Sequence, residues 1–265
     1  MVNLASLVVI AASLVSCVAP KAQPKLRALV YTSKSGIRFV HIPAQTFRMG
    51  GVLDMWPVRK VHVDAFWIAE TELTNEQADK AIPGKRQKES LGDLQPMCGR
   101  GYKEILQLLA ALSRLDGLEY KLPTEAQWEC AARGGLDQAE YPWGSESPYG
   151  RSQIESRVTC EVRTFPPNRY GLYECSGNVS ELIREPYREI VPDPHARVIP
   201  NDPNPTRLSK GGTFNVTYNP VAGRSPQLPE TEHYFDVGVR LMLEDGPTLK
   251  AKAKWEEIAF LRTRG

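Results

Sequence analysis

This 265-residue sequence contains five cysteines, whose side chains are able to bind a soft metal or attack a substrate. They are Cys17, Cys98, Cys130, Cys160 and Cys175. Zinc sites place cysteines in closely spaced pairs, and no two of these cysteines lie that close in the sequence. In an exported protein the last four could form disulfides, but the sequence does not choose among the pairings. Free thiols buried in the interior are the alternative.

The histidines and loop carboxylates form no recognisable catalytic pattern. The histidines are scattered, so no neighbouring pair could supply the facial ligands of a non-haem iron. The sequence contains no serine-hydrolase elbow, no P-loop and no glycine-rich dinucleotide loop. The loop carboxylates lack an evident partner for paired-acid chemistry. The residues concerned are His41, His62, His195, His233, Asp193, Asp202 and Glu230.

The charge balance argues against a nucleic-acid partner. The 33 Lys and Arg against 31 Asp and Glu leave a formal charge of +2, so there is no basic surplus to attract a phosphate backbone. The 20 Gly and 21 Pro are typical of a loop-rich fold of short strands.

The N-terminus resembles that of an exported lipoprotein. An apolar run from Leu4 to Val15 precedes Ser16 and Cys17, which is the small-residue pattern of a lipoprotein cleavage site. We therefore expect a signal peptide at 1–16, a lipidated Cys17, a tether over 17–35, and a domain held at a membrane on the exported side. The uncharged start at Met1 is unusual for such a leader, and a signal peptide without lipidation is the alternative.

Hydrophobic periodicity and turn signals predict a mixture of strands and helices. The main helix, over 101–115, carries Ile105, Leu108, Leu109, Leu112 and Leu115 on one face. A second helix begins at Thr124, which has Gln127 in the capping-box position. We further expect a hairpin over 36–49, a strand over 60–68, a short helix after Thr74, and closing strands at 211–214 and 237–243.

A series of motifs recurs in one order over most of the chain. The series is Phe47-Arg48-Met49-Gly50, Phe66-Trp67-Ile68, Glu72-Leu73-Thr74-Asn75-Glu76-Gln77, Leu122-Pro123-Thr124-Glu125-Ala126-Gln127-Trp128-Glu129, Ala132-Arg133-Gly134-Gly135, Tyr141-Pro142-Trp143-Gly144, Pro167-Asn168, Gly171-Leu172-Tyr173, Gly177-Asn178-Val179, Lys210-Gly211-Gly212 and Gly238-Val239-Arg240. From about Gly36 to Leu243 it resembles the formylglycine-generating enzyme, or sulfatase-modifying factor, family. The resemblance implies an α+β fold of the C-type-lectin-like kind, with short antiparallel strands, two main helices and long irregular loops.

The resemblance also sets the expected domain boundaries. The family-like domain covers 36–246, and 247–265 continues beyond the usual last strand of the family. This tail is a helix candidate with Trp255, Ile258, Ala259 and Leu261 among its apolar residues. We expect a C-terminal helical extension that docks on its own domain or on a partner.

Calcium is the cofactor that the resemblance implies for the Gly177-Asn178-Val179-Ser180-Glu181 loop. In the family this loop binds calcium, and the expected ligands here are Asn178, the carbonyl of Val179, and Glu181. Oxygen ligands on a tight loop suit this hard cation. The family's aromatic residues around the glutamate are replaced by Ser180 and Leu182, so a loop without metal is the alternative.

The family oxidases bind copper(I) through two cysteines between the Gly-Gly-Ser-type strand and the Gly-Phe-Arg-type strand. The corresponding interval here, Thr213 to Val237, contains no cysteine. Copper is therefore not expected, because this soft ion requires soft ligands. An oxidase that uses Cys98, Cys130, Cys160 or Cys175 instead is the alternative.

In lectin-like folds the irregular C-terminal loops form the ligand surface. The candidate ligand-binding residues here are Asn215, Thr217, Tyr218, His233 and Tyr234, which combine amide and aromatic groups. We expect a catalytically silent surface lipoprotein that binds a protein or glycan partner. A variable ligand-display protein on the same fold is a further alternative, and Phe214 and Phe235 are either part of this surface or core residues.

Overall fold

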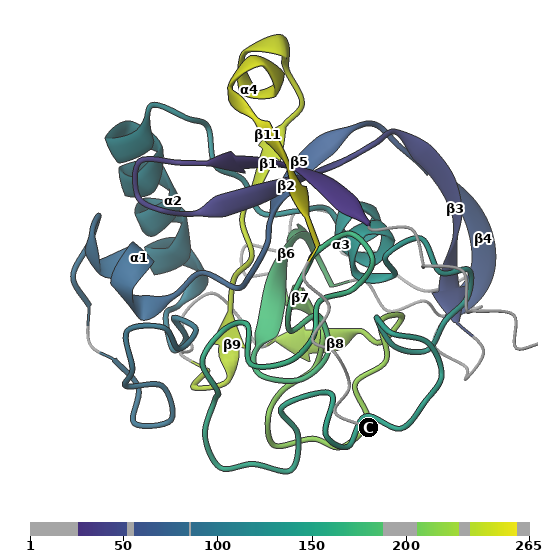
Figure 1. Cartoon of the computed structure of the whole chain (residues 1–265). Helices are drawn as coiled ribbons and strands as arrows, with labels where there is room; N and C mark the ends of the chain where they lie inside the picture. Colours follow the sequence, from purple (N-terminus) through teal and green to yellow (C-terminus); the bar gives the residue numbers. More distant parts are fainter. Residues whose placement is uncertain (1–25, 52–55, 85, 188–205, 228–233, 259–265) are drawn as a thin grey trace, which may run out of the picture.

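The computed structural model describes residues 26–51, 56–84, 86–187, 206–227 and 234–258 (Figure 1). Along these residues the elements are β1 Arg27–Thr32, β2 Arg38–Ile42, β3 Gln45–Gly51, β4 Trp56–Val63, β5 Phe66–Ala69, α1 Asn75–Asp79, α2 Tyr102–Asp116, α3 Glu125–Ala132, β6 Ser180–Pro186, β7 Arg207–Lys210, β8 Ser225–Gln227, β9 Val237–Gly238, β10 Met242–Glu244, α4 Pro247–Lys252 and β11 Lys254–Glu257. Within the described ranges no helix is long and apolar enough to cross a membrane.

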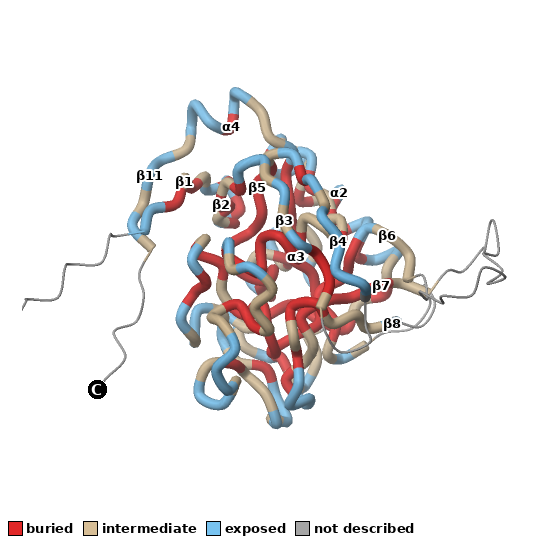
Figure 2. Tube along the Cα trace, turned by 90° about the vertical axis from the view of Figure 1, so that its right-hand side faces the viewer, coloured by how far each residue is buried: buried red, intermediate tan, exposed pale blue. Residues whose placement is uncertain are grey.

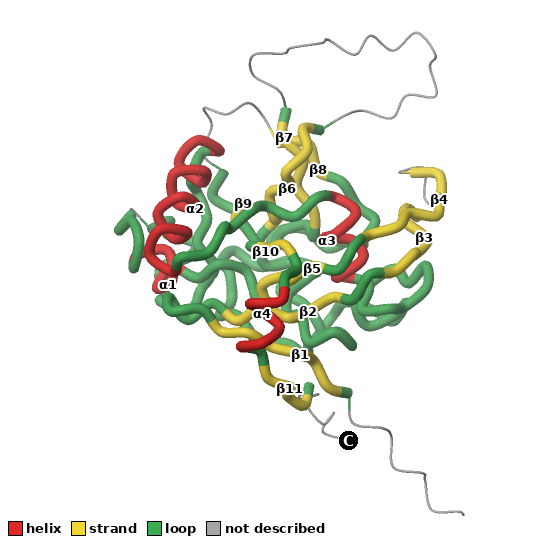
Figure 3. The backbone as a smooth tube through the Cα atoms, turned by 90° about the horizontal axis from the view of Figure 1, so that it is seen from above, coloured by secondary structure: helices red, strands yellow, loops and turns green. Residues whose placement is uncertain are grey.

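An antiparallel sheet in the order β10-β5-β2-β1-β11 forms the framework of the fold. All four residues of β5 are buried, as expected for a strand that is paired on both sides and covered on both faces. The second sheet has the order β8-β7-β6-β9, and β3 and β4 form a separate two-stranded hairpin. Seen from above, α1 and α2 lie on one side of the molecule and the β3–β4 hairpin on the other (Figure 3). The predicted α+β class is confirmed.

The two main helices begin where the sequence predicts. In α2 the side chains of Ile105, Leu108 and Leu112 pack into a core with Phe39 and Trp67. Leu115, which we expected on the same face, is exposed, because it lies on the last turn of the helix. The capping box of α3 is present, and the interior drawn in red in Figure 2 surrounds this helix.

The C-terminal strands differ from the prediction in pairing and position. Residues 211–214 are a bend that leads into a turn, and the strand lies directly before them, at β7. The pair β6 and β9 is parallel, with Ser180 opposite Val237 and Glu181 opposite Gly238. This parallel pair places the Gly177–Glu181 loop beside the segment that carries Arg240.

The segments on both sides of the expected domain 36–246 differ from the prediction. Within the expected tether 17–35, β1 pairs with β2, and Ala28 and Val30 are buried, so the domain starts before Gly36. In the expected helical extension 247–265 only α4 is helical. The extended backbone of Ala253 ends it, and β11 then pairs with β1. Trp255 points to solvent from this edge strand. Cys17, His233, Ala259 and Leu261 lie outside the described residues.

Candidate functional site

A buried ion pair between Arg240 and Glu181 lies at the junction of the two sheets. Arg240 Nη2 donates to Glu181 Oε1 at 2.7 Å and Arg240 Nε donates to Oε2 at 2.9 Å. The remaining guanidinium hydrogens reach the carbonyls of Ala69, Glu70 and Tyr173 at 2.7–3.1 Å. Neither side chain of the pair is accessible to solvent. The paired geometry and the full set of hydrogen bonds make such a buried pair tolerable.

Asn178 and Glu72 form a second buried contact next to this pair. Asn178 has a φ of +61°, which this residue type tolerates, and its Nδ2 donates to Glu72 Oε2 at 2.6 Å. Its Oδ1 accepts from the backbone N–H of Cys160 at 2.9 Å, and Val179 N donates to Glu72 Oε1 at 3.1 Å. Burial, followed by the nearby charge of Glu181, raises the pKa of Glu72 well above its ordinary value.

These contacts do not fit a calcium ion bound by Asn178, Val179 and Glu181. Calcium needs several oxygens that are free to converge on it. The Asn178 oxygen is used by Cys160, and both Glu181 oxygens are used by Arg240, whose charge would repel a cation. Within the described residues no group of three His, Cys, Asp or Glu side chains is arranged to hold a metal. Calcium at this loop stays a prediction that the observed contacts do not favour.

The four cysteines of the described residues are free thiols, so the disulfide interpretation is wrong and the free-thiol alternative is confirmed. Burial raises the pKa of each of these thiols to about 12. Cys130 lines a cavity beside the β3–β4 hairpin, whereas Cys175 lines a different one. The raised pKa disfavours the thiolate, which is the form that binds copper or acts as a nucleophile.

Four consecutive residues, Asn215 to Tyr218, present exposed side chains between two buried anchors, and we call this segment the display loop. Phe214 is 2% exposed and Asn219 is 4% exposed. Asn219 Nδ2 donates to the carbonyls of Thr213 and Val216, both at 3.0 Å, and so holds the loop from inside. The loop backbone is thus fixed while its side chains face solvent.

The display loop brings together three of the five predicted ligand-binding residues. Thr217 Oγ1 donates to Glu155 Oε1 at 2.8 Å, and the exposed Tyr149 donates to the same oxygen at 3.1 Å. Tyr218 contacts the ring of Tyr141 edge-on. Sequence reasoning missed Tyr149 and Glu155, because they belong to a loop that is distant in the sequence.

Tyr234 is not part of the display loop. Its half-buried ring packs against the core cluster that includes residues of α2. Phe214 is a core residue, and the half-exposed Phe235 lies against it with ring centroids 6.1 Å apart.

Comparison with known proteins gives a family match that covers most of the chain. Residues 28–244 match the model of the sulfatase-modifying factor enzyme 1-like domain. The formylglycine-generating enzyme of Thermomonospora curvata is 40% identical over 115 residues, which are 36% of this chain and 38% of that enzyme. The inactive C-alpha-formylglycine-generating enzyme 2 of Mus musculus is 35% identical over 111 residues, or 34% of this chain and 36% of that protein. Both aligned segments thus span little more than a third of these relatives.

Two solved structures show the same fold. PvdO from Pseudomonas aeruginosa superposes with a TM-score of 0.68 at 22% identity, covering 82% of this chain and 98% of that one. Treponema denticola variable protein 1 superposes with a TM-score of 0.66 at 22% identity and the same coverage. The predicted sulfatase-modifying-factor, C-type-lectin-like fold is confirmed.

The central ion pair yields a stability prediction. Replacing Arg240 by Met should lower the free energy of unfolding by about 3 to 5 kcal/mol, because Glu181 is left as a buried, uncompensated charge. The double variant Arg240→Met, Glu181→Leu should recover part of that loss, which urea denaturation of both variants would measure. A double variant no more stable than Arg240→Met would show that the charge of Glu181 is not the cause.

Proposed function

The chain belongs to the sulfatase-modifying factor enzyme 1-like family, and we propose that it is a catalytically silent member that binds a protein or glycan partner. One observation carries the proposal: the interval Thr213 to Val237, where the family oxidases hold their copper-binding cysteines, contains none. Copper(I) is a soft ion, and oxygen or amide groups do not replace thiolates as its ligands. Without bound copper(I) the protein has no metal centre at which the family's oxidation reaction could take place.

The remaining thiols argue against a relocated oxidase centre. A copper-binding pair needs two thiolates that converge on one open site. Cys130 and Cys175 instead line separate cavities, and Cys98 is buried in the core. Burial raises the pKa of all four thiols, Cys160 included, which disfavours the thiolate that copper(I) binds. Oxidase activity in some relatives does not imply activity in this chain, since one relative is named as inactive.

The display loop supports a role in recognition. A rigid backbone lowers the conformational entropy that is lost on binding. Threonine, asparagine and tyrosine side chains form adaptable contacts, and Tyr149 and Glu155 extend the surface beside them. This combination of a hydroxyl, an amide, a carboxylate and aromatic rings suits the polar surface of a protein or glycan.

A variable ligand-display protein is the second candidate, and the anchoring of the loop favours it. Asn219 and Phe214 hold the backbone, so changes in the four side chains between them leave the fold intact. This candidate requires that Asn215 to Tyr218 and His233 to Asp236 differ among sister copies of the gene. Sister copies with uniform sequences there would exclude it.

The site of action that we propose is a membrane surface on the exported side. The support is the leader-like run before Cys17, which the sequence places ahead of β1, the strand beside the edge strand β11 of the main sheet. A diacylglyceryl-type anchor on Cys17 would hold the domain at the membrane and leave the recognition surface free.

The absence of catalysis is testable with purified, reduced protein. We expect no stoichiometric binding of copper(I) in competition with a chelator, and no aldehyde on a cysteine-containing peptide. The formylglycine-generating enzyme of Thermomonospora curvata serves as the positive control. One bound copper per chain together with peptide aldehyde would overturn the proposal.

The display loop should carry the binding. On a glycan array, and by photo-crosslinking from position 216 on intact cells, a defined partner should be captured. Tyr218→Ala and Thr217→Ala should each weaken its binding about tenfold, which corresponds to about 1.4 kcal/mol for one lost contact. Leu91→Ala, an exposed site outside the loop, is the matched control. Equal binding by all three variants would place the partner elsewhere.

Lipid attachment predicts that Cys17→Ser abolishes metabolic labelling with a fatty acid and moves the protein from the membrane fraction to the soluble exported fraction. Cys98→Ser is the control for labelling at another thiol. Labelling that persists in Cys17→Ser would contradict the anchor while leaving the recognition proposal untouched.

A further inference from the structure

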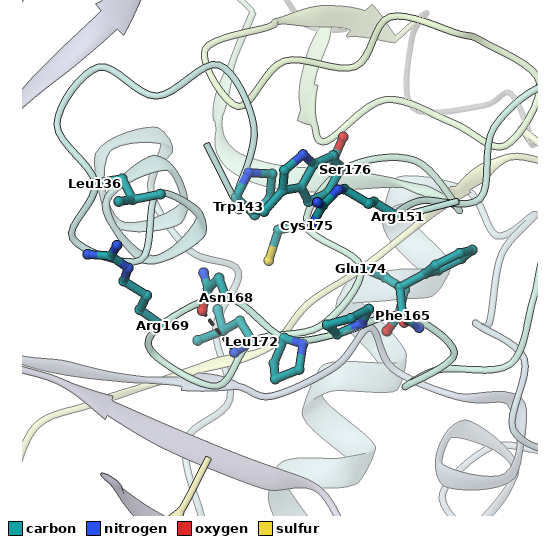
Figure 4. A pocket seen from close by; sticks show the side chains of 13 residues that line it. Leu136, Trp143, Arg151, Phe165, Asn168, Arg169, Leu172, Glu174, Cys175 and Ser176 are labelled. Atoms are coloured by element: carbon teal, nitrogen blue, oxygen red, sulfur yellow. Dashed lines mark hydrogen bonds between the residues drawn. The ribbon is translucent and has the colours of Figure 1, made fainter. Parts of the chain in front are cut away.

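A cavity of about 240 Å³ lies between three loop segments, 142–151, 165–169 and 172–176 (Figure 4). It is separate from the display loop and plays no part in the function proposed above. Most of its lining is apolar, and Cys175 directs its sulfur into the space. The apolar lining residues include Leu136, Pro142, Trp143, Phe165, Pro167 and Leu172.

The aromatic wall of this cavity is fixed in position. Trp143 stacks on Tyr141 with ring centroids 5.2 Å apart and an interplanar angle of 6°. Its Nε1 donates to the carbonyl of Glu146 at 3.0 Å. The Trp143 ring is therefore held by stacking on one face and by a hydrogen bond at its edge. An aromatic ring held in this way offers a preformed apolar surface.

The floor of the cavity is equally rigid. Asn168 Nδ2 donates to the carbonyls of Ala131 and Ala132, the last residues of α3, at 2.8 and 2.9 Å. Its Oδ1 accepts from Leu172 N at 3.1 Å, the bond drawn as a dashed line in Figure 4. The cavity therefore exists before any ligand binds, as is usual for small-molecule sites.

The charged groups around the cavity favour an anion. The side chains of Arg151 and Arg169 line it from opposite sides, and neither makes an ion pair or side-chain hydrogen bond with the rest of the described chain. Arg151 is half-buried, whereas Arg169 is exposed, so Arg151 is the less screened cation. The carboxylate of Glu174 accepts hydrogen bonds from Arg163 N and Phe165 N. Burial raises the pKa of Glu174 to about 7, so this group repels a bound anion less than a fully ionised carboxylate would.

We propose that this cavity binds a small organic acid, with an aromatic or branched aliphatic body against Trp143 and Leu172 and a carboxylate paired with Arg151. An apolar cavity of about 150 Å³ is enough for benzene, so the volume here suits one or two rings. Guanidinium and carboxylate match each other in geometry and charge.

Indole-3-acetate is the probe, and the neutral indole-3-acetamide is its isosteric control. By titration calorimetry and ligand-observed NMR the acid should bind saturably, and about tenfold more tightly than the amide. Arg151→Gln should remove that difference, whereas Arg169→Gln should retain most of it. Bound acid should also slow the alkylation of Cys175, measured by peptide mapping, and leave that of Cys98 unchanged.

Two results would overturn the proposal. One is the absence of saturable binding of either probe at millimolar concentration to protein with an unchanged thermal midpoint. The other is equal affinity for acid and amide, which would make the cavity an apolar site without selection for a carboxylate. Trp143→Ala should weaken both probes, and Thr217→Ala in the display loop should weaken neither. A failure here is therefore distinguishable from a failure of the recognition proposal.

Discussion

The ion pair of Arg240 and Glu181 is the contact on which the arrangement of the two sheets depends. One guanidinium joins the carboxylate of β6 to the backbone carbonyls at the end of β5 and to the loop residue Tyr173. Trp128 of α3 donates its indole N–H to the same carboxylate, so the helix is attached to the pair as well. Burying two charges is costly, and here the cost is offset because each hydrogen-bonding position has a partner. Such a centre tolerates few alternative arrangements of the elements around it.

The loops that could bind ligands are supported by this centre. Asn178 lies in the loop that leads to Glu181. The backbone carbonyl of Asn178 accepts a hydrogen bond from the backbone N–H of Phe214 at 2.7 Å. Phe214 is the first anchor of the display loop. On the other side of the Asn178 loop, Cys175 lies on the wall of the acid-binding cavity. Two surfaces with different chemistry are thus supported by one buried network.

The sequence predicted those elements whose signals are local. The capping box at Thr124 and the apolar face of α2 depend on residues within a few turns, so both helices were found. The strand β11 was mistaken for helix, because its conformation is set by pairing with β1, more than 200 residues away, and not by its own residues. The calcium prediction depends on a distant residue in the same way. Whether Glu181 is free to bind calcium depends on Arg240, and the series of motifs shows that both residues are present without showing that they are paired.

The motifs that identify the family belong mostly to this interior, and this explains how a chain can retain the fold without the oxidase cysteines. Trp128, Glu181 and Arg240 are buried and determine the packing, whereas the display loop exposes its side chains and contributes little to the core. Substitutions in the first group should therefore destabilise the fold strongly, and substitutions in the display loop only weakly. The proposed exchange of metal chemistry for recognition at the loops would therefore leave unchanged the buried residues that stabilise the fold.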